Sequence, residues 1–161
     1  MVLRTVSVLA GFLLASNALA AELPRQGNDS YTTNYVNMYS NLIKLGERTV
    51  SIYESNGVTR NDSGGPMFND MATRCLGMRE VVDGVVLNRG SCIDMDKEGD
   101  QIFTTYESKG PNGIHTFIGG TGKYTGISGT AEFNYNPLKS PENARNMVIV
   151  PHRSNWKLPT K

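Results

Sequence analysis

Two titratable side chains, Glu107 and His115, flank a turn signal at a spacing that suits acid–base chemistry. The intervening residues 110–113 (GPNG) are typical of a three-residue hairpin loop and predict a strand on either side. In that register Glu107 and His115 lie diagonally on one face, together with Phe103. A carboxyl group against aromatic surface holds its proton more tightly and could exchange it with an imidazole. A slip of one residue would replace Glu107 by Tyr106, and a solvent-facing Glu and His is the plainer interpretation.

Three aspartates in an acidic turn, Asp94, Asp96 and Asp100, are the candidate metal ligands. Their alternation matches the first half of an EF-hand loop, in which carboxylates bind Ca²⁺. Thr105 stands where that loop needs its final Glu, and an acidic turn solvated by water is the competing interpretation. The chain has only two histidines, which excludes a site built from three or four His ligands. We therefore predict no metal centre and no cofactor.

Aromatic residues recur in the predicted strands and could line a ligand cavity. The candidates for such a wall are Phe103, Phe117, Phe133 and Tyr135. A barrel of about eight strands either fills its interior with side chains or holds one small ligand. The same residues could therefore form a packed core instead.

Six glycines between Gly113 and Gly129 give the chain its densest turn signal. The segment is not a P-loop, because Tyr124 follows Gly122-Lys123 where that motif needs Ser or Thr. Its glycine spacing also departs from the dinucleotide-binding fingerprint. Since glycine permits positive φ and close backbone approach, we interpret the segment as a strand, a tight corner and a second strand.

The N-terminus has the parts of a secretory signal peptide: Arg4, an apolar run over residues 6–15 and the Ala-Leu-Ala motif ending at Ala20. We predict a signal peptide over residues 1–20, an N-terminal arm over 21–30 and a single β-barrel domain over 31–161. The apolar run is too short to span a bilayer, so no membrane insertion is expected. The protein is therefore expected to be secreted or periplasmic.

The overall charge is nearly balanced, with 16 Lys and Arg against 15 Asp and Glu. A nucleic-acid-binding protein would need a basic excess, so no nucleic-acid partner is expected.

The two cysteines, Cys75 and Cys92, are predicted to form a disulfide, because an exported chain meets an oxidising compartment. Asp83-Gly84 is a strong signal for a two-residue type I′ hairpin. Cys75 lies eight residues before that turn and Cys92 eight residues after it. The cysteines therefore face each other across the hairpin as a non-hydrogen-bonded pair, in which side chains approach most closely.

Short β-strands account for most of the remaining pattern. Residues 31–45 fit either one face of a helix or the alternation of a strand, and we favour the strand. Turn residues are densest at 61–66, in a loop that could cover the mouth of a barrel. Further strands are predicted at 49–55, 67–79, 85–94, 101–107, 114–119, 127–135, 147–150 and 153–158.

One stretch of sequence resembles a known superfamily. The segment FIGGTGKYTGISGT (117–130), the Cys75 to Cys92 spacing and the acidic turn at 94–100 resemble the bacterial secreted relatives of allene oxide cyclase and dirigent barrels. The resemblance covers roughly residues 67–135. It implies an all-β, antiparallel, calycin-like barrel of about eight strands with a central apolar cavity. Characterised members cyclise or orient reactive small molecules without a cofactor, but their catalytic residues do not match this chain position by position.

The first functional expectation is binding of a small apolar or amphipathic molecule in the barrel lumen. One alternative is a cofactor-independent cyclase or isomerase in which Glu107 assists. The other is a solidly packed structural or interaction barrel. The lumen distinguishes them: an open cavity with Glu107 or His115 inside favours the enzyme, and an open apolar cavity favours binding. The identity of the ligand and the oligomeric state are left open by the sequence.

Overall fold

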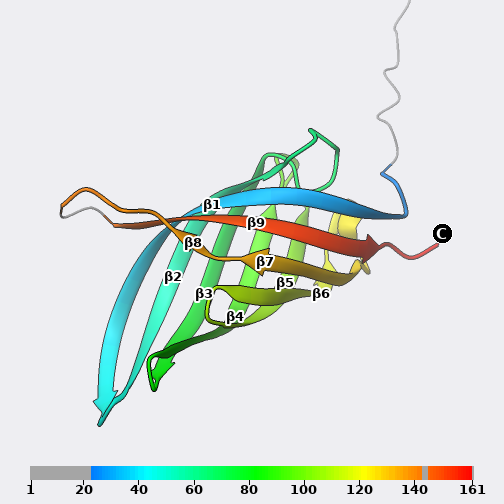
Figure 1. Ribbon diagram of the computed structural model, residues 1–161. Helices are drawn as coiled ribbons and strands as arrows, with labels where there is room; N and C mark the ends of the chain where they lie inside the picture. The colour runs from blue at the N-terminus through cyan, green and yellow to red at the C-terminus, as the bar shows by residue number, and fades with distance from the viewer. Residues whose placement is uncertain (1–22, 143–144, 161) are drawn as a thin grey trace, which may run out of the picture.

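The computed structural model describes residues 23–142 and 145–160, which form one β-barrel (Figure 1). The predicted signal peptide lies outside the described residues. A single short 3₁₀ helix, η1 (Gly122–Tyr124), interrupts the strands, and the described part of the chain contains no helix long and apolar enough to cross a membrane. The strands are β1 (Gln26–Leu45), β2 (Arg48–Asn61), β3 (Met71–Val82), β4 (Val85–Met95), β5 (Gln101–Lys109), β6 (Asn112–Gly120), β7 (Ser128–Asn134), β8 (Asn136–Pro137) and β9 (Asn146–Lys157).

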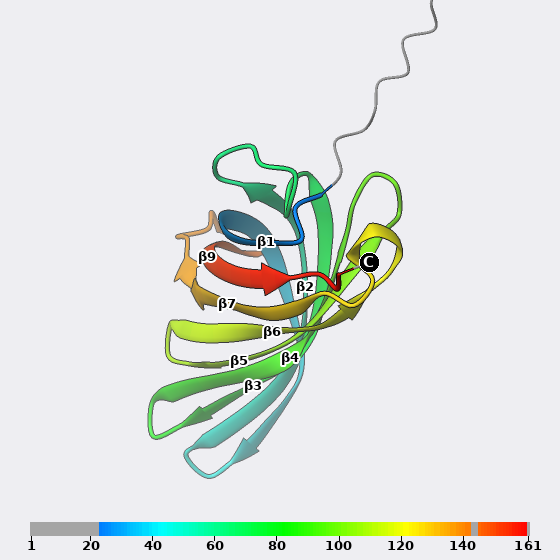
Figure 2. The ribbon, with the colours of Figure 1, turned by 90° about the vertical axis from the view of Figure 1, so that its right-hand side faces the viewer.

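The sheet closes on itself. Its order is β1-β2-β3-β4-β5-β6-β7-β9, β9 pairs back with β1, and every pairing is antiparallel. The two-residue strand β8 extends the pairing of β7 along β9. Figure 2 shows the ring of strands from a second side. The predicted all-β, eight-stranded antiparallel barrel is confirmed.

Strands β1 and β9 are longer than the sequence suggested. Residues 26–30, which we assigned to the N-terminal arm, belong to β1 and pair with Arg153–Lys157 of β9. The indole of Trp156 donates a 2.6 Å hydrogen bond to Asp29 Oδ2 and holds this end in place. Strand β9 also runs unbroken through Pro151, which lies between the β7 and β8 pairings. A proline without an N–H is tolerated there because that position has no partner in either pairing.

The β3–β4 hairpin has the predicted register. Asp83 and Gly84 form the turn with φ angles of 50° and 76°, as a type I′ turn requires. Cys75 therefore pairs with Cys92, and the disulfide between them is present.

The β5–β6 hairpin differs from the prediction. Its strands meet at Lys109 and Asn112, so the loop is two residues long and His115 lies opposite Tyr106 instead of diagonal to Glu107. Gly113 is not used as a turn residue. It lies in β6, where a Cβ atom would overlap the ring of Phe133. The glycine therefore serves close packing, which a turn-based prediction does not anticipate.

A plug of large side chains fills one end of the barrel. Met67 and Phe68, from the loop between β2 and β3, reach inward and are about 1% exposed. Phe68 stacks on Tyr31 with ring centroids 4.4 Å apart and on Phe117 at 5.5 Å. The plug consists of Tyr31, Met67, Phe68, Met71, Ile102, Phe117, Tyr124, Ile127, Ala131, Trp156 and Leu158.

Candidate functional site

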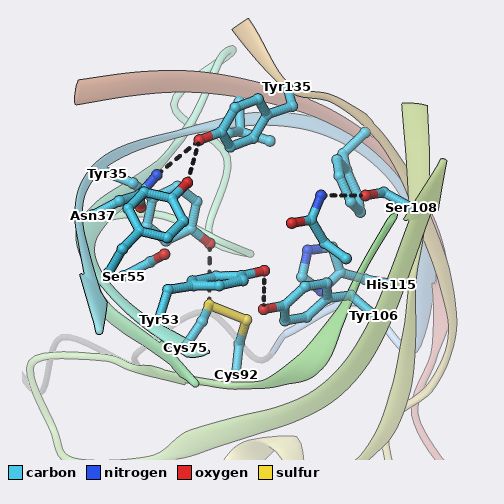
Figure 3. Close-up of a pocket in the computed structure, with 14 residues that line it drawn as sticks. Tyr35, Asn37, Tyr53, Ser55, Cys75, Cys92, Tyr106, Ser108, His115 and Tyr135 are labelled. Atoms are coloured by element: carbon cyan, nitrogen blue, oxygen red, sulfur yellow. Dashed lines mark hydrogen bonds between the residues drawn. A yellow bond between two sulfur atoms is a disulfide. The ribbon is translucent and has the colours of Figure 1, made fainter. Parts of the chain in front are cut away.

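The other end of the barrel is hollow. A narrow inner pocket of about 50 Å³ has room for a few water molecules or for the end of a small organic molecule. It shares Tyr39, Asn88 and Tyr135 with a wider vestibule of about 350 Å³ at the barrel mouth. The inner pocket is lined by Tyr35, Asn37, Tyr39, Tyr53, Ser55, Cys75, Asn88, Cys92, Tyr106, Ser108, His115, Phe133, Tyr135 and Val150, most of them labelled in Figure 3.

A pair of tyrosines crosses the pocket. The hydroxyl groups of Tyr53 and Tyr106 are 2.6 Å apart and share a hydrogen bond (Figure 3). Gly77 and Gly90 lie opposite each other in β3 and β4, directly against this pair. A Cβ atom at Gly77 would clash with both tyrosines, so the absent side chains create the space for the pair. Burial is the main cause that raises the pKa of both phenols, that of Tyr106 to about 12.

A second polar group is formed by Asn37, Tyr39 and Tyr135. The Asn37 amide donates a 2.8 Å hydrogen bond to the Tyr135 hydroxyl, which lies 3.4 Å from that of Tyr39. Asn37 is only 4% exposed, and its Oδ1 atom has no hydrogen-bond partner among the described residues. A buried acceptor without a donor is costly, so Asn37 Oδ1 is a polar atom at the pocket wall with unused hydrogen-bonding capacity.

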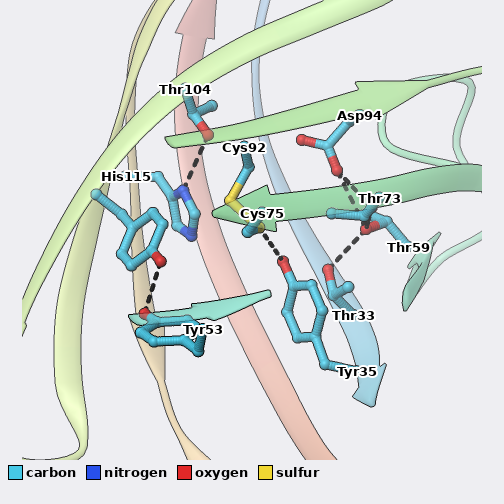
Figure 4. Close-up of a disulfide and its surroundings, with 11 residues drawn as sticks. Thr33, Tyr35, Tyr53, Thr59, Thr73, Cys75, Cys92, Asp94, Thr104 and His115 are labelled. Carbon is cyan, nitrogen blue, oxygen red and sulfur yellow. Dashed lines mark hydrogen bonds between the residues drawn. A yellow bond between two sulfur atoms is a disulfide. The ribbon is translucent and has the colours of Figure 1, made fainter. Parts of the chain in front are cut away.

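His115 supplies the only imidazole of the pocket lining. Its Nδ1 lies 3.1 Å from Thr104 Oγ1, and its ring packs against Tyr106 and Phe133 with centroids 5.2 Å and 5.0 Å away. Burial lowers its pKa to about 4, so the ring is neutral at pH 7. The second ring nitrogen points away from Thr104, toward the side where Tyr53 lies (Figure 4). A neutral imidazole so placed can accept a proton or a hydrogen bond.

Beneath His115 lies a second buried histidine. The ring of His152 stacks on Tyr31, with centroids 4.3 Å apart, and lies 5.3 Å from the ring of His115. Burial, followed by the proximity of His115, lowers the pKa of His152 well below its usual value. The two neutral histidines thus connect the plug to the floor of the pocket.

The disulfide forms part of the pocket wall. The Tyr35 hydroxyl lies 3.5 Å from Cys75 Sγ, and both cysteines are less than 5% exposed. Because the lining includes no Asp, Glu, Lys or Arg and His115 is neutral, the inner pocket carries no net charge at pH 7. Its chemistry is that of phenols, amides and apolar surface.

A chain of hydroxyl groups crosses the barrel interior on the plug side of the disulfide (Figure 4). Thr33 and Thr59 are joined by a 2.7 Å hydrogen bond, Thr59 and Thr73 by one of 2.6 Å, and Thr73 donates to Asp94 Oδ1 at 2.5 Å. Burial raises the pKa of Asp94 to about 6 despite these hydrogen bonds. Asp94 is therefore an interior acid, but it does not line the pocket.

The other two candidate metal ligands, Asp96 and Asp100, contact backbone N–H groups and Lys123. Asp96 accepts hydrogen bonds from the backbone N–H groups of Glu98 and Asp100 and pairs with Lys123 Nζ at 2.6 Å. Asp100 accepts the backbone N–H of Lys123. The described residues contain no cluster of three or more His, Cys, Asp or Glu side chains able to hold a metal ion. The acidic turn is organised around a lysine and backbone amides, while Asp94 faces the threonines.

The remaining sequence candidates divide between the two faces of the barrel. Glu107 and Phe103 share the outer face of β5, Glu107 exposed and Phe103 half-buried, so the expectation that they face His115 was wrong. Phe117 lies inside but in the plug. Phe133 and Tyr135 line the pocket and stay candidates for a ligand wall.

Several pocket residues were not among the sequence candidates. Tyr53 and Asn88 belong to no sequence motif that would mark them as site residues. Their inward position follows only from the strand register. For Asn37 a signal existed, since it belongs to the alternating series Tyr31, Thr33, Tyr35, Asn37 and Tyr39. Tyr106 was expected on the His115 face only after a one-residue slip, and the observed register places it there.

Comparisons with known proteins give a fold relationship. No known family model matches the sequence, and no curated protein sequence matches it. Among solved structures, the barrel is similar to that of a pterocarpan synthase dirigent protein, with a TM-score of 0.50 and 10% sequence identity over 93% of this chain and 100% of the other. The similarity to dirigent barrels that the glycine-rich segment implied is therefore supported at the level of the fold.

Proposed function

We propose that this protein binds a small amphipathic molecule whose uncharged part enters the inner pocket through the open end of the barrel. The observation that carries the proposal is Asn37 Oδ1, a buried acceptor without a partner in a pocket otherwise lined by aromatic and small polar side chains. A ligand hydroxyl or N–H group would satisfy this acceptor and recover the cost of its burial. Apolar ligand surface would be covered by the surrounding tyrosines and by Phe133.

We further propose that the protein acts outside the cytoplasm, in the periplasm or after secretion. The disulfide between Cys75 and Cys92 supports this location, because such bonds persist in oxidising compartments.

A second candidate function is a cofactor-independent cyclase or isomerase. It is favoured by His115, which brings a neutral imidazole to the pocket floor and could take a proton from a bound substrate. Glu107, the acid first considered for this role, lies on the outer face of the barrel and is not proposed for it. The structural similarity to a pterocarpan synthase dirigent protein agrees with a lumen that holds a small molecule. The third candidate, a solidly packed structural barrel, describes only the end filled by the plug.

Two measurements test the binding proposal. Protein purified from its native compartment is analysed by native mass spectrometry before and after organic extraction, and a retained small molecule supports binding. The purified protein is also titrated with the neutral dye N-phenyl-1-naphthylamine. Ser108→Phe, which fills the pocket mouth, should weaken dye binding about tenfold, whereas Thr105→Phe on the outer face of the same strand should not. Absence of both a retained molecule and dye fluorescence would refute the proposal.

A further inference from the structure

Arg79 is the charged residue among the described residues that line the barrel mouth. It lies near the end of β3, lines the vestibule and also lines the adjoining open hollow next to β1 and β2. Its guanidinium carbon lies 5.7 Å from the ring centroid of Tyr39, which itself lines the inner pocket. The cation is therefore held at the boundary between the inner pocket and solvent, stacked on an aromatic wall.

No ion pair among the described residues involves Arg79. The arginines Arg48 and Arg74, on neighbouring parts of β2 and β3, pair with Glu80 and Glu54. Arg79 has the cation–π contact instead, and it is only partly exposed. A half-buried guanidinium retains five N–H donors in a fixed fork that fits a carboxylate or a similar oxyanion.

The surroundings of Arg79 do not supply such an anion. Every other described residue that lines the vestibule or the adjoining hollow is uncharged. The positive field of Arg79 also extends into the pocket, where it acts to lower the pKa values of Tyr53 and Tyr135 against the larger effect of burial. Among the described residues that line the mouth, Arg79 thus supplies one positive charge above a neutral cavity.

We propose that the ligand of this pocket is a small organic anion whose charged head pairs with Arg79 at the mouth and whose uncharged body extends past Tyr39 into the inner pocket. This inference rests on the proposed binding function and specifies the ligand class. The head is a carboxylate or another oxyanion that can accept two N–H bonds from one guanidinium. The order of contacts inward is Arg79, the Tyr39 ring, the Tyr135 hydroxyl and Asn37, which suits a molecule with one polar group at its far end.

The test uses two fluorescent probes with the same aromatic body. The anionic probe is 1-anilinonaphthalene-8-sulfonate, and the neutral probe is N-phenyl-1-naphthylamine, which lacks the sulfonate. Arg79→Gln removes the cation, and Arg89→Gln is the matched control, because Arg89 is exposed on the outer face of the adjacent strand β4. The expected result is a loss of about tenfold in affinity for the anionic probe in Arg79→Gln alone, with the neutral probe changed less than about twofold. Higher salt should weaken only binding of the anionic probe.

The outcomes separate this inference from the binding proposal. Equal affinity of the wild type and Arg79→Gln for the anionic probe, with the neutral probe still bound, would overturn the assignment of Arg79 and leave pocket binding intact. Failure of the wild type to bind either probe would overturn both. Binding of the neutral probe by Arg79→Gln shows at the same time that the variant has folded with its pocket formed, so a loss of the anionic probe cannot come from misfolding.

Discussion

Protonation of His115 should destabilise the barrel in mild acid. The ring is 8% exposed, and burial lowers its pKa from an ordinary 6.5 to about 4. In the unfolded chain the same imidazole regains a pKa near 6.5. Between these two values the unfolded state binds a proton that the folded state does not. The stability contributed by the neutral ring is therefore complete above pH 6.5 and is lost as the pH falls toward 4.

The size of the effect follows from the pKa difference. A drop from 6.5 to about 4 corresponds to about 3 kcal/mol of unfolding free energy. His152 acts in the same direction, because burial lowers its pKa as well and the nearby His115 adds to the effect. Against a typical domain stability of about 5–15 kcal/mol, the two rings together would make the wild type strongly acid-sensitive.

The assay compares the wild type with His115→Gln, which keeps a side chain able to hydrogen-bond Thr104 but does not titrate. Urea unfolding is followed by the fluorescence of the single tryptophan, Trp156, which is 2% exposed in the folded state. Between pH 7 and pH 4 the variant should lose about 3 kcal/mol less stability than the wild type. NMR titration of the wild type should give a midpoint near pH 4 for the His115 ring. Glu107→Gln serves as a matched control, because Glu107 is exposed on the outer face of the neighbouring strand and does not share a face with His115.

A parallel loss of stability in the wild type and His115→Gln would contradict the argument. So would an NMR midpoint near 6.5, because that value would mean that the imidazole is solvated in the folded protein.

Three further changes should alter stability in urea unfolding experiments. Asp94→Asn should raise the free energy of unfolding by up to about 3 kcal/mol at pH 7 and very little at pH 3. The reason is that burial raises the pKa of the Asp94 carboxyl to about 6, so the wild type loses stability as the pH rises from about 4 to 6. Equal stability of the variant and the wild type at pH 7 would contradict this reasoning. Met71→Ala, which removes part of the plug, should lower the free energy of unfolding by about 2–5 kcal/mol. Leu76→Ala, at a residue that is 56% exposed in the same strand, should lower it by well under half as much, and equal losses would contradict the position of the core described above. Replacing both Cys75 and Cys92 by Ala should cost about 3 kcal/mol by the chain-entropy model, and an unchanged urea midpoint would show that the disulfide does not stabilise the fold.

The sequence predicted the parts of the fold in which two independent signals agreed. Asp83-Gly84 set a turn type, and the equal distances of Cys75 and Cys92 from it checked the register. At the β5–β6 hairpin no second signal was available. Gly113 was interpreted as a turn residue, although its actual role is to leave room for the Phe133 ring, a contact between β6 and β7 that local patterns do not contain.

That one register determined the candidate site. Side chains alternate between the two faces of a strand, so the observed pairing of Tyr106 with His115 turns Glu107 and Phe103 outward and Tyr106 inward. The predicted acid–base pair of Glu107 and His115 is therefore absent, and His115 lies beside the phenol of Tyr106 instead. Where a site lies on strands, its residue list is only as good as the register of each hairpin.

The position of the inner pocket follows from a gradient in side-chain size along the barrel axis. This gradient can be recognised only when the strand registers are known. Toward the plug the strands turn large residues inward, such as Met71, Phe117 and Trp156. Toward the mouth many inward positions of β2 to β6 are small: Ser51, Ser55, Gly77, Gly90, Ser108 and Gly113. Eight strands enclose an interior that large side chains just fill, so small ones leave a space. Tyr53 of β2 and Tyr106 of β5 extend over Gly77 and Gly90 of the two intervening strands and meet through their hydroxyl groups, which makes the pocket polar as well as open. The glycines are therefore as necessary to the candidate site as the tyrosines that line it.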